Sequence, residues 1–238
     1  MGDRMSTIEV NAIDKESGST LTLGGSGTAV TLHASATASG FGLNSVQVFT
    51  SSGTWTRPTG VTKVLMEIQG GGGAGSRSDN TDNQRHGGAG GGYAKKFLNV
   101  SSISTSTITV GAGGAATSSN DTAGGNGGNS IWADGTNTIT GNGGGGGVIT
   151  ANTPTAGGTA TGGDLNIQGG NSTSLDSSGG MAADGAGSSM FGFRGESHWS
   201  GSNPASLAST GYGAGTGPGK GNNSLAAGPG IVIVWEYK

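Results

Sequence analysis

Several residue types are scarce in this chain, and each scarcity excludes a class of protein. There is no cysteine, which excludes disulfide bonds and thiolate metal sites. The longest apolar run is IVIVW at residues 231–235, so we expect neither a signal peptide nor a membrane span. With 11 Lys and Arg against 14 Asp and Glu, nothing favours a nucleic acid as partner. Hydrophobic residues make up only 31%, so we do not expect an ordinary packed core.

Glycine, in contrast, is abundant, with 54 residues among 238. Such a composition is by itself typical of low-complexity disorder. Two features favour an ordered structure: the net charge is only -3, and the glycines gather in runs separated by polar segments. The runs lack the every-third spacing of collagen. A flexible linker would not need the apolar residues that recur between the runs, namely Tyr93, Phe97, Ile131, Trp132, Leu165 and Ile167.

Short strands are predicted on both sides of the glycine runs. Residues 6–33 alternate apolar and polar residues over stretches too brief to fold alone. Residues 46–69 predict two longer strands around a TRPTG turn, and residues 231–237 predict a third. The apolar cluster expected there consists of Phe49, Trp55, Val61, Val64 and Met66. These strands would clamp the glycine-rich middle of the chain.

The glycine runs themselves predict polyproline-II-type helices. Such a helix makes no hydrogen bonds within itself, so its amides must pair with neighbouring helices. Glycine alone lets the backbones approach closely enough for that pairing. The fold class predicted is therefore mostly irregular and β: a sandwich of about ten polyglycine-II helices, clamped by short strands, with a small N-terminal β region.

If each run crosses the slab once, the segments between runs alternate between its two ends. The far-end segments are 76–86, 115–123, 148–156, 171–178 and 188–209, and the base segments are 93–110, 129–140, 164–168, 181–184 and 220–227. The base set holds most of the regular apolar residues. The far set is rich in Ser, Asn, Thr and Asp around a few aromatic and Arg residues, a composition typical of binding loops.

The order of these pieces resembles a known family. The stretches FTSSGTWTRPTGVTKVLMEIQGGGGAG, GGAGGGYAKKFLNV, ITVGAGG, GGNGGNSIW and GPGIVIVWEY look like the glycine-rich domain of bacteriophage tail-fibre tip adhesins, similar to that of T-even-type long tail fibres. The resemblance covers residues 46–238. It implies a polyglycine-helix receptor-binding domain, whereas residues 1–45 look like the short β repeats of other tail-fibre proteins and are predicted to serve attachment or oligomerisation.

From this resemblance we expect a virion protein at the distal end of a tail fibre, made in the host cytoplasm, that mediates viral attachment and host recognition. Its partners would be a host outer-membrane protein or surface polysaccharide and the fibre shaft or another virion protein, with the chain itself a homotrimer. The residues expected to contact the receptor are Arg77, Asp79, Asp82, Arg85, His86, Asn120, Asp121, Asn152, Leu175, Asp176, Phe193, Arg194, Glu196, His198 and Trp199.

Catalysis and cofactor binding are not expected. His86 and His198 lack a third spaced metal ligand, and no GxSxG motif marks a hydrolase. The stretch GAGTGPGKG at residues 213–221 departs from a phosphate loop at Ala214 and Gly221. The alternative function is a glycine-rich structural or ice-binding protein built on the same helices. An ice-binding protein needs a flat, regular face of small residues such as Ala or Thr, whereas the predicted loops are irregular and charged.

Overall fold

A computed structural model describes residues 42–78, 85–149, 154–173, 185–198, 205–219 and 224–238. Within these ranges every regular element is a β-strand, and the remaining chain has no regular secondary structure. This confirms the prediction of a mostly irregular and β protein. No helix long and apolar enough to cross a membrane occurs in these ranges. Of the predicted attachment region, residues 1–45, only residues 42–45 belong to the described chain.

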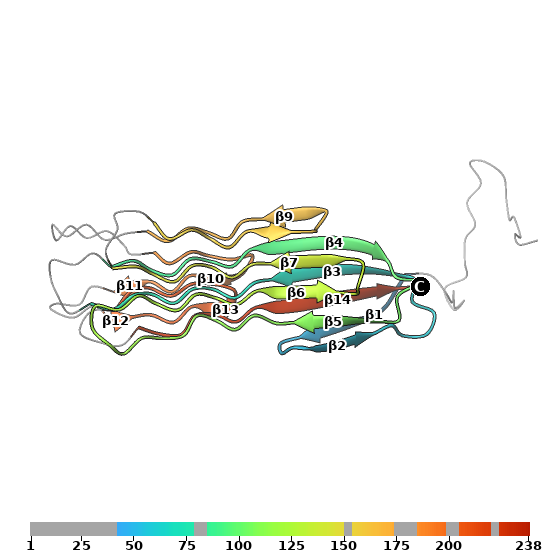
Figure 1. Cartoon of the computed structure of the whole chain (residues 1–238), viewed down its shortest axis with the longest axis horizontal. Helices are drawn as coiled ribbons and strands as arrows, with labels where there is room; N and C mark the ends of the chain where they lie inside the picture. The colour runs from blue at the N-terminus through green and yellow to red at the C-terminus, as the bar shows by residue number, and fades with distance from the viewer. Residues whose placement is uncertain (1–41, 79–84, 150–153, 174–184, 199–204, 220–223) are drawn as a thin grey trace, which may run out of the picture. The chain divides into compact units, whose positions relative to one another are not determined.

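Two five-stranded antiparallel sheets stand at one end of the domain (Figure 1). Sheet A has the order β1 (Leu43–Phe49), β14 (Ile231–Tyr237), β3 (Lys63–Gln69), β4 (Tyr93–Asn99) and β9 (Leu165–Ile167). Sheet B has the order β2 (Gly53–Thr56), β5 (Thr105–Thr109), β6 (Ser130–Ala133), β7 (Thr138–Gly141) and β8 (Ala160–Thr161). The predicted strand at 231–237 is confirmed, whereas residues 46–69 contain three strands instead of two.

An apolar core fills the space between the two sheets. Val64 and Met66 alternate with outward residues on β3, as expected for a strand with one buried face. The rings of Trp55 from β2 and Trp132 from β6 lie 4.9 Å apart at a tilt of 48°. Trp55, Val61, Val64 and Met66 of the expected cluster are fully buried, and Phe49 packs against them. The expectation that no ordinary core exists is therefore wrong for this end of the domain, because residues from both sheets join one cluster.

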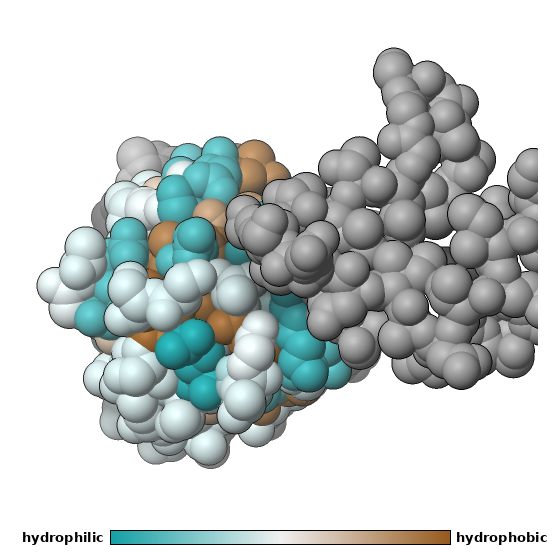
Figure 2. Space-filling view, turned by 90° about the vertical axis from the view of Figure 1, so that its right-hand side faces the viewer, coloured by the Kyte–Doolittle hydropathy of each residue, from teal (hydrophilic) through white to brown (hydrophobic). Residues whose placement is uncertain are grey.

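Polar side chains close the core at two places. The fully buried carboxylate of Glu236 accepts hydrogen bonds from Trp55 Nε1 and Gln47 Nε2, both at 2.7 Å, and from the Ser45 hydroxyl. In the β6–β7 turn, burial raises the pKa of Asp134, but bonds from Asn137, Trp132 and Thr136 outweigh it and lower that pKa overall. Seen from this end, hydrophobic residues (brown) appear between hydrophilic ones (teal) in Figure 2.

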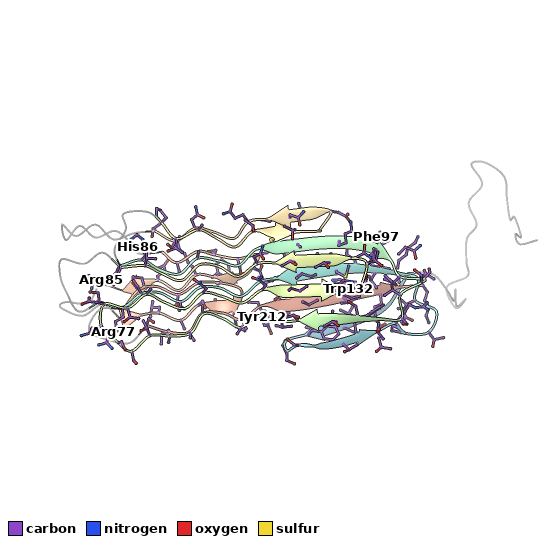
Figure 3. The ribbon with its side chains drawn as sticks, in the orientation of Figure 1. Arg77, Arg85, His86, Phe97, Trp132 and Tyr212 are labelled. Atoms are coloured by element: carbon purple, nitrogen blue, oxygen red, sulfur yellow. The ribbon has the colours of Figure 1, made fainter. Side chains whose placement is uncertain are left out.

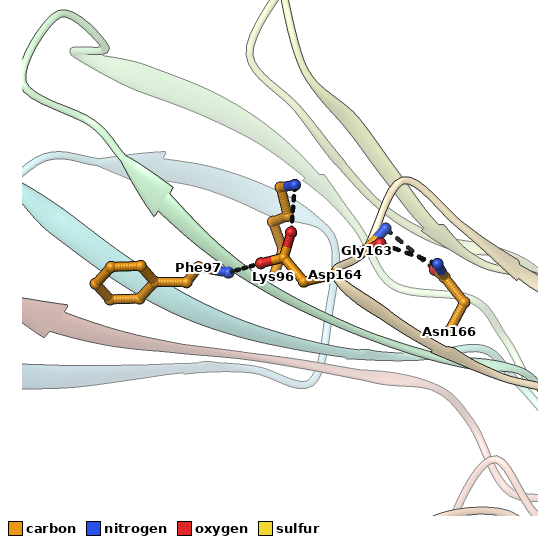
Figure 4. A network of polar contacts seen from close by, with 5 residues as sticks. All are labelled: Lys96, Phe97, Gly163, Asp164 and Asn166. Atoms are coloured by element: carbon orange, nitrogen blue, oxygen red, sulfur yellow. Dashed lines mark hydrogen bonds and ion pairs between the residues drawn. The ribbon is translucent and has the colours of Figure 1, made fainter.

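A tight turn between β8 and β9 carries the chain from sheet B to sheet A. Gly162 takes a φ of 79°, a left-handed conformation that suits glycine. The Asp164 carboxylate then accepts from Lys96 Nζ at 2.6 Å and from the Phe97 amide at 2.9 Å (Figure 4). The hydrogen bond from Lys96, followed by that from the Phe97 amide, lowers the pKa of Asp164. Asp164 thereby fixes the short edge strand β9 against β4.

The glycine-rich segments extend from the strands as a second region with a different internal order (Figure 1). In residues 70–77, N–H groups three positions apart donate to the same neighbouring segment. Gly70, Gly73 and Ser76 donate to Gly92, Ala89 and His86, while Gly71, Ala74 and Arg77 donate to Gly128, Gly125 and Thr122, all at 2.8–3.0 Å. Carbonyl groups follow the same period, since Gly71 and Ala74 accept from Gly144 and Gly147. Backbone groups make most of the hydrogen bonds of this region, and a few side chains add to them, since Asn129 and Asn126 accept from the amides of Gly143 and Gly146.

Close backbone approach explains why glycine fills these segments. A Cβ atom at Gly72 would lie 2.1 Å from the Ala214 carbonyl oxygen, and one at Gly73 would lie 2.0 Å from that of Gly145. Neither distance permits a side chain. Alanine occurs where space exists, as at the fully buried Ala74 and Ala89.

The predicted alternation of segments between the two ends holds in part. Residues 93–110, 129–140 and 164–168 form base strands as expected, and residues 181–184 lie outside the described residues. Of residues 220–227, expected at the base, residues 220–223 lie outside the described residues and Ser224 is wrongly assigned: its amide donates to Thr117 O in a far-end segment.

The error in the alternation comes from segments that run along the glycine-rich region but contain little glycine themselves. The Met190 amide donates to Gln69 Oε1 at the end of β3, so the start of segment 188–209, which was expected at the far end, lies instead beside the strands. The chain then leaves through β10 (Phe191–Phe193) and β11 (Ser197–His198) and comes back through β12 (Ala205–Ser206) and β13 (Thr210–Tyr212). Counting glycine runs could not detect this hairpin.

Candidate functional site

The far end of the glycine-rich region gathers residues from segments distant in sequence. The Ser78 amide donates to Gly219 O at 3.2 Å, and Thr173 N donates to Gly185 O at 2.8 Å. Figure 3 shows Arg77, Arg85 and His86 at this end, while Phe97 and Trp132 lie among the strands. The first bond joins the residues that precede the stretches 79–84 and 220–223, and the second joins the two residues that flank the stretch 174–184.

Three of the predicted receptor-contacting residues form one cluster here. Arg77 donates through its guanidinium to Ser118 O, and the Ser78 hydroxyl donates to the Asp121 carboxylate. Asn120 and Asp121 are exposed, and Asp121 takes a φ of 50°, which aspartate tolerates better than most residues. The structure therefore joins the predicted segments 76–86 and 115–123 into one surface.

Arg85 and His86 lie elsewhere than predicted. Their exposures are 7% and 0%, so both side chains are buried rather than presented on a loop. The His86 backbone pairs with Ser76: the Ser76 amide donates to His86 O at 3.0 Å, and the His86 amide donates to Ser76 Oγ at 3.1 Å. Arg85 Nη1 donates to Ser78 O at 3.4 Å. This pairing turns both side chains inward, so they do not form part of the exposed surface.

A second exposed group lies on the β10–β13 hairpin. Phe193 is 80% exposed, the highest value among the exposed large hydrophobic residues of the described chain. Arg194 Nε lies 3.6 Å from Glu196 Oε1, and both side chains are exposed. All three residues were predicted as receptor contacts from the sequence.

Two shallow hollows beside Phe193 include residues that the sequence did not single out. One, of about 380 Å³, is lined by Ser188, Met190, Phe191, Phe193 and Thr210. The other, of about 290 Å³, is lined by Tyr93, Ile167, Gln168 and Met190. Met190 borders both and is 59% exposed. Its position beside the aromatic FGF stretch is the only sequence signal that marks it.

The other predicted contacts lie outside the described residues. These are Asp79, Asp82, Asn152, Leu175, Asp176 and Trp199, and the side chain of His198 is likewise not described.

The described residues offer no group of three or more His, Cys, Asp or Glu that could hold a metal ion. The arrangement offers instead an exposed aromatic ring, an exposed ion pair and polar loop residues on a backbone held by many hydrogen bonds. Such a surface can bind, since aromatic and Arg side chains contribute most to interface energies and rigid supports reduce the entropy lost on binding.

Comparison with known families gives one match, to a family described as glycine-rich domain, over residues 46–235. A comparison with the curated proteins finds no match. The matched range includes both sheets except for the ends of β1 and β14, and all the glycine-rich segments described above. By this match over most of its length, the chain belongs to the glycine-rich domain family.

Proposed function

We propose that the glycine-rich segments are polyglycine-II helices packed side by side. The support is the period of three in the hydrogen bonds of residues 70–77, which equals the three residues per turn of that helix. The absence of space for Cβ atoms at Gly72 and Gly73 agrees with the same close packing. Backbone torsions from a crystal structure test this: φ near −75° and ψ near +145° are expected, and the more extended φ of β-strands, about −120° to −140°, over these residues would contradict it.

We further propose that the protein is a bacteriophage tail-fibre tip adhesin, located at the distal end of the fibre in the virion. The observation that carries the proposal is the exposed group of Phe193, Arg194 and Glu196 on a support made of backbone hydrogen bonds. A rigid support with adaptable polar residues and aromatic anchors is the usual design of a recognition surface. The resemblance of the sequence to tail-fibre adhesins points the same way.

In this proposal the protein is a binding protein without catalytic activity or cofactor. Its receptor is a host outer-membrane protein or a surface polysaccharide, and its virion partner is the fibre shaft. In an association of three copies, three weak receptor contacts would act together and give firm attachment.

Adsorption of the purified, labelled protein to a panel of bacterial strains tests the proposal. Saturable binding to one host is expected, and protease or periodate treatment of the cells separates a protein receptor from a glycan. Replacing Phe193 and Arg194 with Ala should reduce binding at least tenfold, because hot-spot residues contribute about 2 kcal/mol or more each. Thr107→Ala, on an exposed strand far from the hairpin, is the matched control and should bind normally. Absence of saturable binding to every strain would contradict the adhesin proposal.

A second candidate, ice binding, has one observation in its favour. The outer face of sheet B carries exposed or half-exposed threonines on three strands: Thr54 and Thr56 on β2, Thr105, Thr107 and Thr109 on the adjacent β5, and Thr138 and Thr140 on β7, with Ile131 and Ala133 of β6 between β5 and β7. Strand geometry spaces such residues about 6.6 Å along a strand and about 4.8 Å between strands, a regular array of small side chains. Thermal hysteresis that Thr107→Lys abolishes would favour this candidate over the adhesin.

A further inference from the structure

The outer face of sheet A carries apolar side chains on all five strands, with one charged pair among them. Strand register places two rows of outward side chains on it: Val46, Trp235, Leu65 and Phe97 in one row, and Val48, Ile233, Glu67, Lys95 and Leu165 in the next. Along the central strands β3 and β14 they alternate with buried core residues. Val48 is 56% exposed, Phe97 51% and Leu165 48%. Side chains of this kind on one sheet face are usually covered.

The charged residues at the centre of this face have partners within it. Glu67 accepts from Tyr93 Oη at 2.7 Å and from Trp235 Nε1 at 2.9 Å, and its carboxylate lies 3.8 Å from Lys95 Nζ. Covering the face would therefore leave the Glu67 charge satisfied, which avoids the cost of a buried unpaired charge. Burial and the Glu67 carboxylate together raise the pKa of Tyr93, so its hydroxyl stays a donor at neutral pH.

The outer face of sheet B provides a comparison inside the same molecule. Its outward residues are mainly threonines, and none of the large exposed hydrophobic residues of the described chain belongs to it. The two sheets share one core, although the strands of sheet B are shorter. Strand propensity alone does not explain why only sheet A carries large exposed aromatic and aliphatic side chains outward.

We infer that the outer face of sheet A is an interface between copies of this chain, three of which pack these faces around a common axis. Glu67 and Lys95 balance each other, so facing copies do not repel. The 42 residues before β1 join the chain at an edge strand of this same sheet. Their short apolar stretches, such as Ile8 to Val10 and Leu21 to Leu23, need pairing with other strands.

This inference rests on the three-copy association in the proposed function, and names the surface that would make it. It differs from the receptor site, because Phe193 and Arg194 lie on the hairpin and outside both rows.

Light scattering of the full chain in solution tests the interface without any receptor. The expected mass is three times the 22.8 kDa of one chain. The double variant V48E/F97E should fall to the mass of one chain, because it places two carboxylates in the apolar face. The control T54E/T138E adds the same charge to exposed positions on sheet B and should keep the full mass. A single-chain mass for the unsubstituted protein, an unchanged mass for V48E/F97E, or dissociation of the control would each overturn the inference.

Cross-linking gives a second measurement that does not depend on how V48E/F97E folds. The chain has no cysteine, so a single one can be introduced without background. Phe97→Cys should yield linked dimers with a short bismaleimide, whereas Thr107→Cys should not. Equal cross-linking at both positions, or none at Phe97→Cys, would overturn the interface. Adsorption to cells, measured separately on the same variants, shows whether receptor binding fails independently.

Discussion

The strand region and the glycine region are stabilised by different interactions, apolar burial in the first and backbone hydrogen bonds in the second. In the strand region, Trp55, Trp132 and aliphatic residues exclude water between two sheets. In the glycine region few large apolar side chains are available to bury, and amides and carbonyls of neighbouring segments bond to one another. The first arrangement tolerates a change of shape by repacking, whereas the second has backbone atoms as its contact surface. Single methyl groups should therefore matter more in the glycine region than in the apolar core.

The largest effect is expected from Gly73→Ala. Its Cβ would lie 2.0 Å from Gly145 O and 2.5 Å from the carbonyl carbon, so two backbone segments must separate. We expect the free energy of unfolding to fall by more than about 4 kcal/mol, measured by denaturant unfolding. Gly53→Ala is the control, because the nearest atom to its Cβ is Phe49 Cδ1 at 4.0 Å. Equal stability of the two variants would contradict close packing of the glycine segments.

Trp132→Ala probes the apolar side of the comparison. The indole is fully buried against Trp55, and its Nε1 donates to Asp134 at 3.1 Å. The expected loss is about 3–5 kcal/mol, from lost burial and the cavity left behind. Phe193→Ala, at an 80% exposed position, should change stability by less than about 0.5 kcal/mol. A small effect of Trp132→Ala would mean that the glycine region alone supports the fold.

Glu236→Gln tests whether the polar closure of the core depends on a carboxylate. The buried oxygens accept from Ser45, Gln47 and Trp55, and an amide would turn an NH₂ group toward one of these donors. A loss of about 1–3 kcal/mol is expected from the unsatisfied donors. Glu196→Gln, exposed on the hairpin, makes the same chemical change and should leave the unfolding midpoint unaltered. Similar midpoints for both variants would argue against a structural role for the Glu236 charge.

The smallest effect is a pH dependence at the junction of the two regions. Tyr93 of β4 packs edge-on against Phe191 of β10 at 5.6 Å, and its pKa is raised by burial and then by Glu67. A raised pKa means that the folded protein holds the phenol proton more tightly than the unfolded chain. Stability from this group is complete below the ordinary tyrosine pKa of about 10 and is lost as the pH rises above it.

Urea unfolding on both sides of that pH measures the effect. Tyr93→Phe should reduce the loss of stability at high pH, whereas Tyr237→Phe serves as the control and should keep the dependence of the unsubstituted protein. A pH dependence that Tyr93→Phe leaves unchanged would assign it to another group.

Local sequence signals predicted the strands well and the tertiary arrangement poorly. The alternation in residues 231–237 and the glycines after residue 69 are local patterns, and both marked real boundaries. The cluster around Trp55 was predicted, but its contact with sheet B was not, because Trp132 meets Trp55 only after sheet pairing that no local pattern specifies. The hairpin beginning at Met190 was missed for the same reason. The chain reverses direction beside Gln69, a residue far away in the sequence that contacts the Met190 amide.

The candidate site was predicted through composition, and composition does not report burial. Arg77 and Asp121 lie where loop residues were expected. Arg85 and His86 have the same residue types, yet their backbone pairing with Ser76 turns them inward. The burial of a polar residue next to a glycine run depends on the alignment of two paired segments, such as the one that contains Ser76 and the one that contains His86.

The central place of β14 has a consequence for the order in which the protein can fold during synthesis. This strand, near the end of the sequence, lies between β1 and β3, which are made much earlier. Gly228, just before it, accepts from Gly72. While the ribosome is still synthesising the chain, β1 and β3 have no strand between them. Their apolar faces stay uncovered until nearly the whole chain has been made. Such non-local closure slows folding and leaves strand edges open to aggregation, so nascent chains of this protein should depend on chaperones more than released ones.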